Sequence, residues 1–121
     1  MDKSMRVIIA GSRSWTDWDI MKSSLDRMKE KITEVVSGTA RGADEMGEWW
    51  AQENNIPIKR FPADWSRYGK AAGFIRNEEM AKYADALVAF RVGHTKGTSN
   101  MIKLAYKYGL RVEVFDDGST Y

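Results

Sequence analysis

Five basic side chains stand at or just before the expected starts of helices: Arg13, Arg41, Lys70, Arg76 and Lys96. A helix N-terminus has unpaired backbone N–H groups and the positive end of the helix dipole, so acidic residues are favoured there and basic ones are mildly unfavourable. A bound anion would resolve this conflict, because a phosphate accepts hydrogen bonds from the N–H groups and from the cations together. The chemistry that these residues indicate is therefore anion binding.

Glycines accompany these cations in each of the four turns concerned. Gly38, Gly42, Gly93 and Gly97 would let the backbone approach a ligand closely or adopt a positive φ. Any one turn taken alone is equally consistent with an ordinary glycine loop whose charges are solvated. Four such turns at one edge of a sheet would instead favour a ligand site.

Arg76 shares a helical stripe with Met80 and Ala84, which we expect to face the core. An arginine is rarely buried without a partner, so its place in the first turn suggests that it leans into the cleft, with Asn77 beside it. The alternative is a partly exposed arginine that pairs with an acidic neighbour, Glu79 or Asp64.

Aromatic residues offer a second kind of contact. Trp65 and Tyr68, in the third turn, could stack on a planar ring, although Trp65 could equally cover the core. The remaining tryptophans are expected to be packing residues or a dimer patch; they are Trp15, Trp18, Trp49 and Trp50.

The elements that must position these residues can be predicted from apolar spacing. Strands are expected at residues 6–10, 33–37, 57–61, 86–90 and 111–115, and helices at about 16–31, 43–54, 71–83 and 98–109. This alternation is typical of an α/β, Rossmann-like, doubly wound sheet of five parallel strands with helices on both faces, and we expect one such domain over residues 1–121. Right-handed crossovers would then bring all four turns to the carboxyl edge of the sheet, where ligands bind.

Composition narrows the function further. The 121 residues hold 19 Lys and Arg against 17 Asp and Glu, and a net charge of +2 is too balanced to predict nucleic-acid or membrane binding. The chain has no cysteine, and its one histidine, His94, has no metal-ligand spacing around it, so we expect no metal site and no cofactor. The N-terminal segment resembles neither a signal peptide nor a spanning helix, and we expect a cytoplasmic protein.

The common catalytic and nucleotide fingerprints are missing from the sequence. It contains neither G-x-G-x-x-G after the first strand, nor G-x-x-x-x-G-K-[ST], nor G-x-S-x-G. Classical dehydrogenases, P-loop NTPases and hydrolases with a nucleophile elbow are therefore disfavoured.

Four motifs in order resemble the YspA-like branch of the SLOG superfamily: "GSR", "VVSGTARGAD", "FPADWSRYGKAAGFIRNEEM" and "ADALVAFRVGHTKGTSNMI". The superfamily joins the DNA-processing protein A family, which has similar elements and binds single-stranded DNA, to the LOG-type phosphoribohydrolases. The resemblance implies a Rossmann-like pocket for a nucleotide or a nucleotide-derived ligand, such as ADP-ribose or a cyclic relative.

One position departs from the LOG pattern. Residues 76–80, "RNEEM", match the "RxxxM" helix of LOG enzymes, and residues 93–98 loosely resemble their "GGxGTxxE" loop, but Met101 stands where those enzymes have glutamate. A carboxylate is needed there to stabilise the oxocarbenium-like transition state or to position water. If the chain is an enzyme, the resemblance implies that Arg76 holds phosphate, and Glu78, Glu79 or Asp64 would have to supply the acid.

We therefore predict a protein that senses or sequesters a phosphorylated nucleotide-derived small molecule. A nucleotide N-glycosidase is the alternative and single-stranded DNA binding is the second alternative, which the near-neutral charge disfavours. We also expect homo-oligomers, because the surplus tryptophans would leave an apolar face to cover. The predicted ligand-binding residues are Gly11, Ser12, Arg13, Ser37, Gly38, Thr39, Arg41, Gly42, Asp44, Asp64, Trp65, Tyr68, Lys70, Arg76, Asn77, Gly93, Lys96, Gly97, Thr98 and Ser99.

Overall fold

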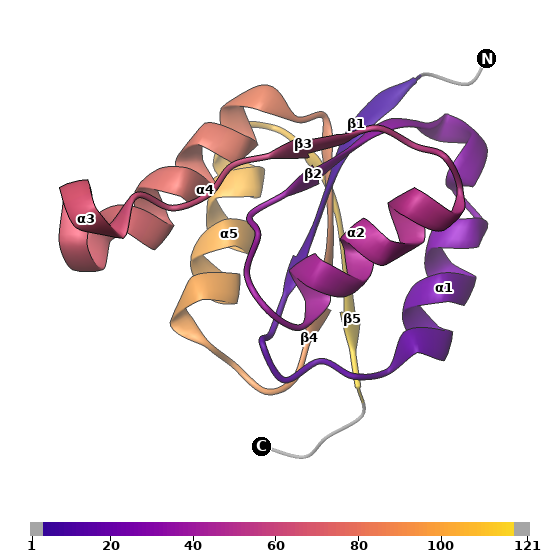
Figure 1. The fold of residues 1–121 in the computed structure, drawn as a ribbon, viewed down its shortest axis with the longest axis horizontal. Coiled ribbons are helices and arrows are strands. Elements are labelled where there is room, and N and C mark those ends of the chain that lie inside the picture. Colours follow the sequence, from indigo (N-terminus) through magenta and orange to yellow (C-terminus); the bar gives the residue numbers. More distant parts are fainter. Residues whose placement is uncertain (1–3, 118–121) are drawn as a thin grey trace.

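Five parallel strands form one sheet in the computed structural model, which describes residues 4–117 (Figure 1). Their order in space is β3-β2-β1-β4-β5, and each neighbouring pair is parallel. The strands are β1 (Met5–Gly11), β2 (Ile32–Ser37), β3 (Ile58–Arg60), β4 (Ala86–Arg91) and β5 (Arg111–Asp116). The predicted α/β, Rossmann-like, doubly wound fold with five parallel strands is confirmed.

Helices cover both faces of this sheet, with α1 and α2 on one side and α4 and α5 on the other (Figure 1). The short helix α3 projects away from the sheet beyond α4. The helices are α1 (Trp18–Asp26), α2 (Ala43–Glu53), α3 (Trp65–Tyr68), α4 (Ala72–Tyr83) and α5 (Lys96–Lys107), with single 3₁₀ turns at η1 (Lys29–Lys31) and η2 (Gly69–Ala71).

The central strand β1 divides the core into two layers because successive side chains of a strand point to opposite faces. Val7 and Ile9 pack in the layer under α1 and α2, while Ile8 and Ala10 pack in the layer under α4 and α5. All four side chains are buried. A strand buried on both faces reads as a continuous apolar run, which is why this strand could be predicted from the sequence.

The first helix is shorter than predicted. The prediction of residues 16–31 was wrong in extent, because α1 begins at Trp18 and ends at Asp26, and the chain then passes through η1 before β2. Asp17 caps the helix, because its Oδ1 accepts a hydrogen bond from the backbone N–H of Ile20 at 3.0 Å.

Helix α3 is a second difference, because its residues were expected to be a turn. Asp64 caps it by accepting a hydrogen bond from the backbone N–H of Arg67 at 3.1 Å. A four-residue helix is too short to show apolar periodicity, so spacing alone could not predict it.

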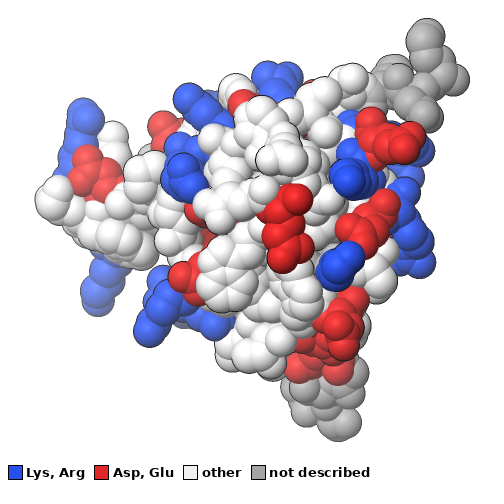
Figure 2. All heavy atoms as spheres, turned by 45° about the vertical axis from the view of Figure 1, so that its right-hand side comes forward, with Lys and Arg blue, Asp and Glu red and all other residues white. Residues whose placement is uncertain are grey.

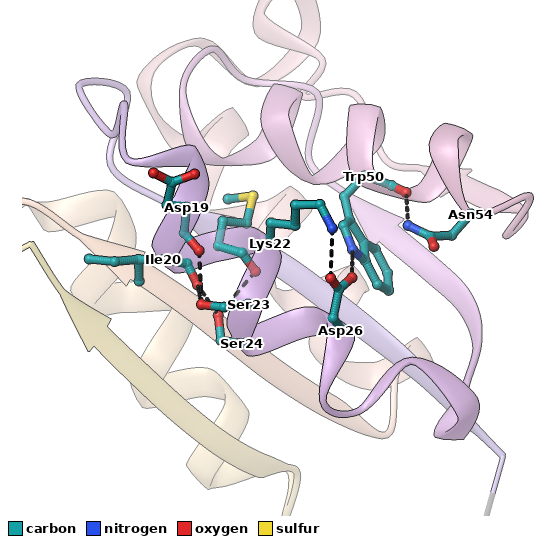
Figure 3. Close-up of polar contacts among 9 residues, drawn as sticks. Asp19, Ile20, Lys22, Ser23, Ser24, Asp26, Trp50 and Asn54 are labelled. Atoms are coloured by element: carbon teal, nitrogen blue, oxygen red, sulfur yellow. Dashed lines mark hydrogen bonds and ion pairs between the residues drawn. The ribbon is translucent and has the colours of Figure 1, made fainter.

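A partly buried hydrogen bond joins α1 to α2 (Figure 3). The indole N–H of Trp50, a fully buried residue of α2, donates to Oδ1 of Asp26 at 2.9 Å. The other carboxylate oxygen of Asp26 accepts from Nζ of Lys22, one turn earlier in α1, at 2.8 Å. The last turn of α1 is thereby tied to the middle of α2.

The connections on the two sides of β1 create a crevice. The chain runs outward from β1 through β2 to β3, then crosses back to β4 on the other side of β1. The loop after β1 leads to the α1 face, and the loop after β4 leads to the α5 face. In open α/β sheets ligands bind at such a point, beyond the carboxyl ends of the strands.

Candidate functional site

A pocket of about 390 Å³ opens at this switch point, where the carboxyl ends of β1 and β4 lie side by side. Its volume falls within the range of about 300–1,000 Å³ that is usual for small-molecule sites. The lining comes from β1 and its following loop, the β2–α2 segment, α4 and the start of α5: Ala10, Gly11, Arg13, Ser14, Ala40, Asp44, Arg76, Asn77, Met80, Thr95, Gly97, Thr98 and Met101.

Arg76 brings a cation into the pocket from α4 and is only partly exposed. Its Nη1 donates to the backbone carbonyl of Gly38, and its Nε donates to Oδ1 of Asn77 at 3.0 Å. Burial lowers the pKa of the Arg76 guanidinium; the Asp44 carboxylate opposes this effect and the Arg13 charge adds to it. Two like charges are thus held near each other at the pocket.

Asp44 brings a buried carboxylate into the same pocket from the first turn of α2. Asp44 is only 5% exposed, and its Oδ2 accepts a hydrogen bond from the backbone N–H of Ala40 at 3.2 Å. Burial raises the pKa of Asp44 to about 6, although the Ala40 N–H and the Arg76 charge both act to lower it. At pH 7 the group is therefore mainly an ionised hydrogen-bond acceptor.

The start of α5 forms the opposite wall. Thr95, at its N-cap, donates from Oγ1 to Oγ1 of Thr98 at 3.1 Å, and the first turn contains no acidic residue. Asn77 ties this turn to α4, because its Nδ2 donates to the carbonyl of Gly97 at 3.2 Å and to Oδ1 of Asn100 at 3.0 Å. The unpaired N–H groups of a helix start and its positive dipole end are thus held beside the two arginines.

Two glycines allow the strand ends to approach their neighbours closely. A Cβ atom on Gly11 would lie 1.9 Å from the carbonyl oxygen of Phe90, on β4. A Cβ atom on Gly38 would lie 2.8 Å from Nη1 of Arg76 and 2.9 Å from Oδ2 of Asp44. Side chains at these positions would displace either the neighbouring strand or the charged groups of the pocket.

Two buried serines support the loops around the pocket rather than line it. Ser12 Oγ accepts from the backbone N–H of Val92 at 2.8 Å, which joins the loop after β1 to the loop after β4. Ser37 Oγ donates to Oε2 of Glu48 at 2.6 Å and accepts from the backbone N–H of Thr39 at 3.1 Å. Both residues are buried and neither lines the pocket.

The pocket unites part of the predicted set of ligand-binding residues. The predicted residues that line it are Gly11, Arg13, Asp44, Arg76, Asn77, Gly97 and Thr98. Sequence reasoning missed Ala10, Ser14, Ala40, Met80, Thr95 and Met101. Ser14 and Thr95 are polar residues of the same turns as the predicted ones, so turn membership could have identified them, whereas the methionines have the spacing of ordinary core residues.

Other predicted residues lie around the pocket or away from it. Trp65 and Tyr68 are 52% and 40% exposed on α3, although the Cβ position of Gly73 lies 3.5 Å from the Trp65 ring and 3.7 Å from Nη2 of Arg76. The Trp65 ring and the Arg76 guanidinium therefore both approach Gly73. The remaining predicted residues outside the lining are Ser12, Ser37, Gly38, Thr39, Arg41, Gly42, Asp64, Lys70, Gly93, Lys96 and Ser99, together with Glu79.

Arg41 and Gly42 belong to a separate groove of about 670 Å³ on the α1–α2 side, which we call the tryptophan groove. Arg13 is the residue that borders both the pocket and this groove. The groove is lined by Arg13, Trp15, Thr16, Trp18, Arg41, Gly42, Glu45, Met46, Trp49 and Glu53.

Neither a metal-ligand cluster nor a helix that could span a membrane is found among residues 4–117. In this range no three histidine, cysteine, aspartate or glutamate side chains gather as a metal site would require. None of the helices described over the same range has the length and apolar character needed to cross a bilayer.

Comparison with known proteins gives matches in family, sequence and fold. The model of the YspA, cpYpsA-related SLOG family (YAcAr) matches residues 5–68. The Gene 61 protein of Mycobacterium phage D29 is 40% identical over 122 residues, which covers 93% of this chain and 97% of that protein. DNA processing protein A (DprA) of Streptococcus pneumoniae has a similar structure, with a TM-score of 0.59 over 93% of this chain and 59% of DprA, at 13% identity. This last likeness concerns the fold, and this chain corresponds to little more than half of DprA.

Proposed function

This chain belongs to the YspA, cpYpsA-related SLOG family, and from that premise we propose that it binds a phosphorylated nucleotide-derived small molecule in the pocket between β1 and β4. The observation that carries the proposal is the convergence of Arg13, Arg76 and the start of α5 on one pocket. Each of these groups is a donor with positive charge or positive partial charge, and a phosphate accepts from all of them. The ligand's phosphate therefore lies between the two arginines, where it relieves their mutual repulsion.

The rest of the pocket suits the nucleoside part of such a ligand. Asp44 offers a buried acceptor, and in dinucleotide-binding folds an acidic residue accepts hydrogen bonds from ribose hydroxyls. Met80 and Met101 offer apolar wall against which a base or sugar face can pack. Trp65, which approaches Arg76 over Gly73, provides a ring at the outer side for a longer ligand.

The ligands that fit this description are nucleoside monophosphates and their larger relatives, such as ADP-ribose or a cyclic ADP-ribose relative. The pocket volume of about 390 Å³ lies toward the lower end of the range for ligand sites, so one nucleotide unit fills it and a larger ligand extends beyond it. Such binding serves to sense or sequester a nucleotide signal inside a bacterial cell, including one infected by a phage. The 40% identical relative is a protein of a phage, D29.

Binding is favoured over hydrolysis by the identity of the acidic residues. Met101, which is 2% exposed, lines the pocket at the position of the LOG glutamate. The three carboxylates considered as substitutes are not among the lining residues: Asp64 caps α3, Glu78 accepts from the Tyr108 hydroxyl at 2.6 Å, and Glu79 is exposed. Asp44 is the carboxylate that lines the pocket, and it lies beside the cations that would hold phosphate.

The proposal is tested by thermal shift and titration calorimetry with AMP, ADP-ribose, inorganic phosphate and a single-stranded oligonucleotide. A nucleotide at about 100 times its dissociation constant adds about 2.7 kcal/mol to the free energy of unfolding. Arg76→Ala should remove this gain, while Arg27→Ala, at an exposed arginine beyond the end of α1, should retain it. Failure of both nucleotides to bind would contradict the proposal.

The same samples separate the alternative functions. Chromatography that detects free adenine after incubation with AMP would indicate the N-glycosidase. Oligonucleotide binding that weakens steeply with salt would indicate single-stranded DNA binding, the second alternative.

A further inference from the structure

Asn77 is a buried polar residue at the pocket between β1 and β4, and its side chain connects two walls of that pocket. It lies in the middle of α4, is only 5% exposed, and lines the pocket beside Arg76. A buried amide costs free energy unless its donors and its acceptor are paired. The partners of Asn77 therefore show what the residue does in the site.

The oxygen of the Asn77 amide holds Arg76. Oδ1 accepts a hydrogen bond from Nε of Arg76 at 3.0 Å, and Nη1 of the same guanidinium donates to the backbone carbonyl of Gly38. Two contacts at different nitrogens fix both the position and the rotation of this planar group. Neither contact uses Nη2, which remains a donor for a ligand.

The nitrogen of the same amide holds the start of α5. Nδ2 donates to the carbonyl of Gly97 at 3.2 Å and to Oδ1 of Asn100 at 3.0 Å. An amide nitrogen has two N–H bonds, so these contacts use both of them and leave none for a phosphate. The amide cannot be reversed either, because Nε of Arg76 only donates and so requires the oxygen on its side.

Exposed charged side chains offer a contrast to this restraint. On the face turned forward in Figure 2, basic and acidic side chains lie intermixed on the outer surface. An exposed ion pair such as Lys22–Asp26 restrains its partners weakly, because solvent screens the charges. A flexible cation loses conformational entropy when it binds an anion, whereas a cation already fixed by hydrogen bonds loses less.

We propose that Asn77 is the positioning residue of the phosphate site, which holds the Arg76 guanidinium and the first turn of α5 in one fixed arrangement. In this role Asn77 acts through its two neighbours and donates no hydrogen bond to the ligand. The inference rests on the proposed function, because it assigns the arrangement of the groups that would bind phosphate there. Loss of the amide should therefore weaken binding even though no contact with phosphate is removed.

The first test uses the full chain without a ligand. In a proton–nitrogen correlation NMR spectrum, the Nε–H signal of Arg76 is identified by its loss in Arg76→Lys. Asn77→Leu fills a similar volume without an acceptor and should make this proton exchange with water about tenfold faster or more. Asn77→Asp keeps an acceptor and should retain the slow exchange. Unchanged exchange in Asn77→Leu would overturn the proposal.

The second test measures affinity by calorimetry for AMP or ADP-ribose, whichever binds the wild type more tightly. Asn77→Leu should weaken binding by about tenfold or more in the wild type. In the Arg76→Lys background, which lacks the planar guanidinium, the same change should weaken binding by about threefold or less. Equal losses in the two backgrounds would show that residue 77 acts on the fold rather than through Arg76, and would overturn the proposal.

Asn77→Asp gives an independent check if Asn77→Leu does not fold. Its carboxylate still accepts from Arg76, but it has no N–H group for Gly97 or Asn100 and it places a negative charge beside the phosphate. Its nucleotide affinity should therefore fall by about tenfold or more. Wild-type affinity in Asn77→Asp would contradict the proposal.

The matched control is Asn54→Leu. Asn54, at the end of α2, donates from Nδ2 to the backbone carbonyl of Trp50 at 2.8 Å and does not line the pocket. Its replacement should leave nucleotide affinity unchanged, and a loss as large as that in Asn77→Leu would overturn the proposal. If neither nucleotide binds the wild type, the proposed function fails, while the exchange measurement still decides whether Asn77 positions Arg76.

Discussion

Arg76 donates a hydrogen bond from Nη1 to the backbone carbonyl of Gly38, a residue 38 positions earlier in the chain. The contact joins α4 to the end of β2, across the face of the sheet that α4 covers. It also aims the guanidinium at the pocket between β1 and β4. One side chain thus combines a structural contact with the main cationic group of the proposed site.

Replacing Arg76 should therefore separate binding from folding. Arg76→Ala should reduce nucleotide affinity by about tenfold or more. It should also lower the free energy of unfolding by about 1–3 kcal/mol, because the variant loses the hydrogen bonds to Gly38 and Asn77. Arg76→Lys should keep the charge without the planar donor pair, so its nucleotide affinity should fall between those of the wild type and Arg76→Ala. Calorimetry gives the affinities and urea unfolding the stabilities; a variant with wild-type affinity would contradict the assigned role.

Asp44 should make stability depend on pH. Its folded-state pKa of about 6 lies above the ordinary value of 3.8, so the folded protein binds the Asp44 proton more tightly than the unfolded chain does. Ionising this buried carboxyl therefore lowers the free energy of unfolding. The loss is absent below about pH 4, grows as the pH rises, and is complete above about pH 6. Asp44→Asn should therefore be more stable than the wild type at pH 7 to 8, by up to about 3 kcal/mol, with the difference vanishing toward about pH 4.

Urea unfolding of both proteins across this pH range is the measurement for Asp44. The difference between the two curves isolates residue 44, because every other titrating group is common to both proteins. A difference that stays constant with pH would show that the carboxyl titrates normally in the folded state.

Two glycines at the pocket should respond oppositely to alanine. Gly11→Ala should destabilise the protein by more than about 3 kcal/mol, because its Cβ would lie 1.9 Å from the Phe90 carbonyl oxygen. Gly97→Ala, where no atom lies within 4 Å of the Cβ position, should be neutral or stabilise the first turn of α5 by up to about 1 kcal/mol. Thermal unfolding compares the two, and similar losses in both variants would argue against the close packing of β1 on β4.

The contact between α1 and α2 should depend on Asp26 more than on Lys22. Asp26→Ala leaves the buried Trp50 indole N–H without its acceptor and should cost about 1–3 kcal/mol. Lys22→Ala removes an exposed ion pair alone and should cost less than Asp26→Ala, because solvent screens exposed ion pairs. Chemical unfolding of both variants checks this order, and an equal or larger loss of stability in Lys22→Ala would contradict it.

Much of the fold could be predicted because its determinants are local. Val7 to Ala10 and Ala86 to Phe90 are buried on both faces, so they appear as unbroken apolar runs in the sequence. Regular alternation of such runs with helical spacing leaves few arrangements other than a doubly wound sheet. The switch point then follows from topology, which is why Gly11, Arg76 and Thr98 could be expected at one edge.

The sequence by itself determined that cations and glycines gather at the carboxyl edge of a parallel sheet, but only the tertiary structure decided on which side of that edge each residue lies. Arg41 and Asp44 are three positions apart, yet Arg41 borders the tryptophan groove and Asp44 the pocket. Gly42 separates them at φ 75°, packed so closely on the loop after β1 that a Cβ atom would lie 2.4 Å from the carbonyl oxygens of Ser12 and Arg13. The direction of the chain there depends on a contact between two loops far apart in sequence, and the spacing of residues carries no record of such a contact.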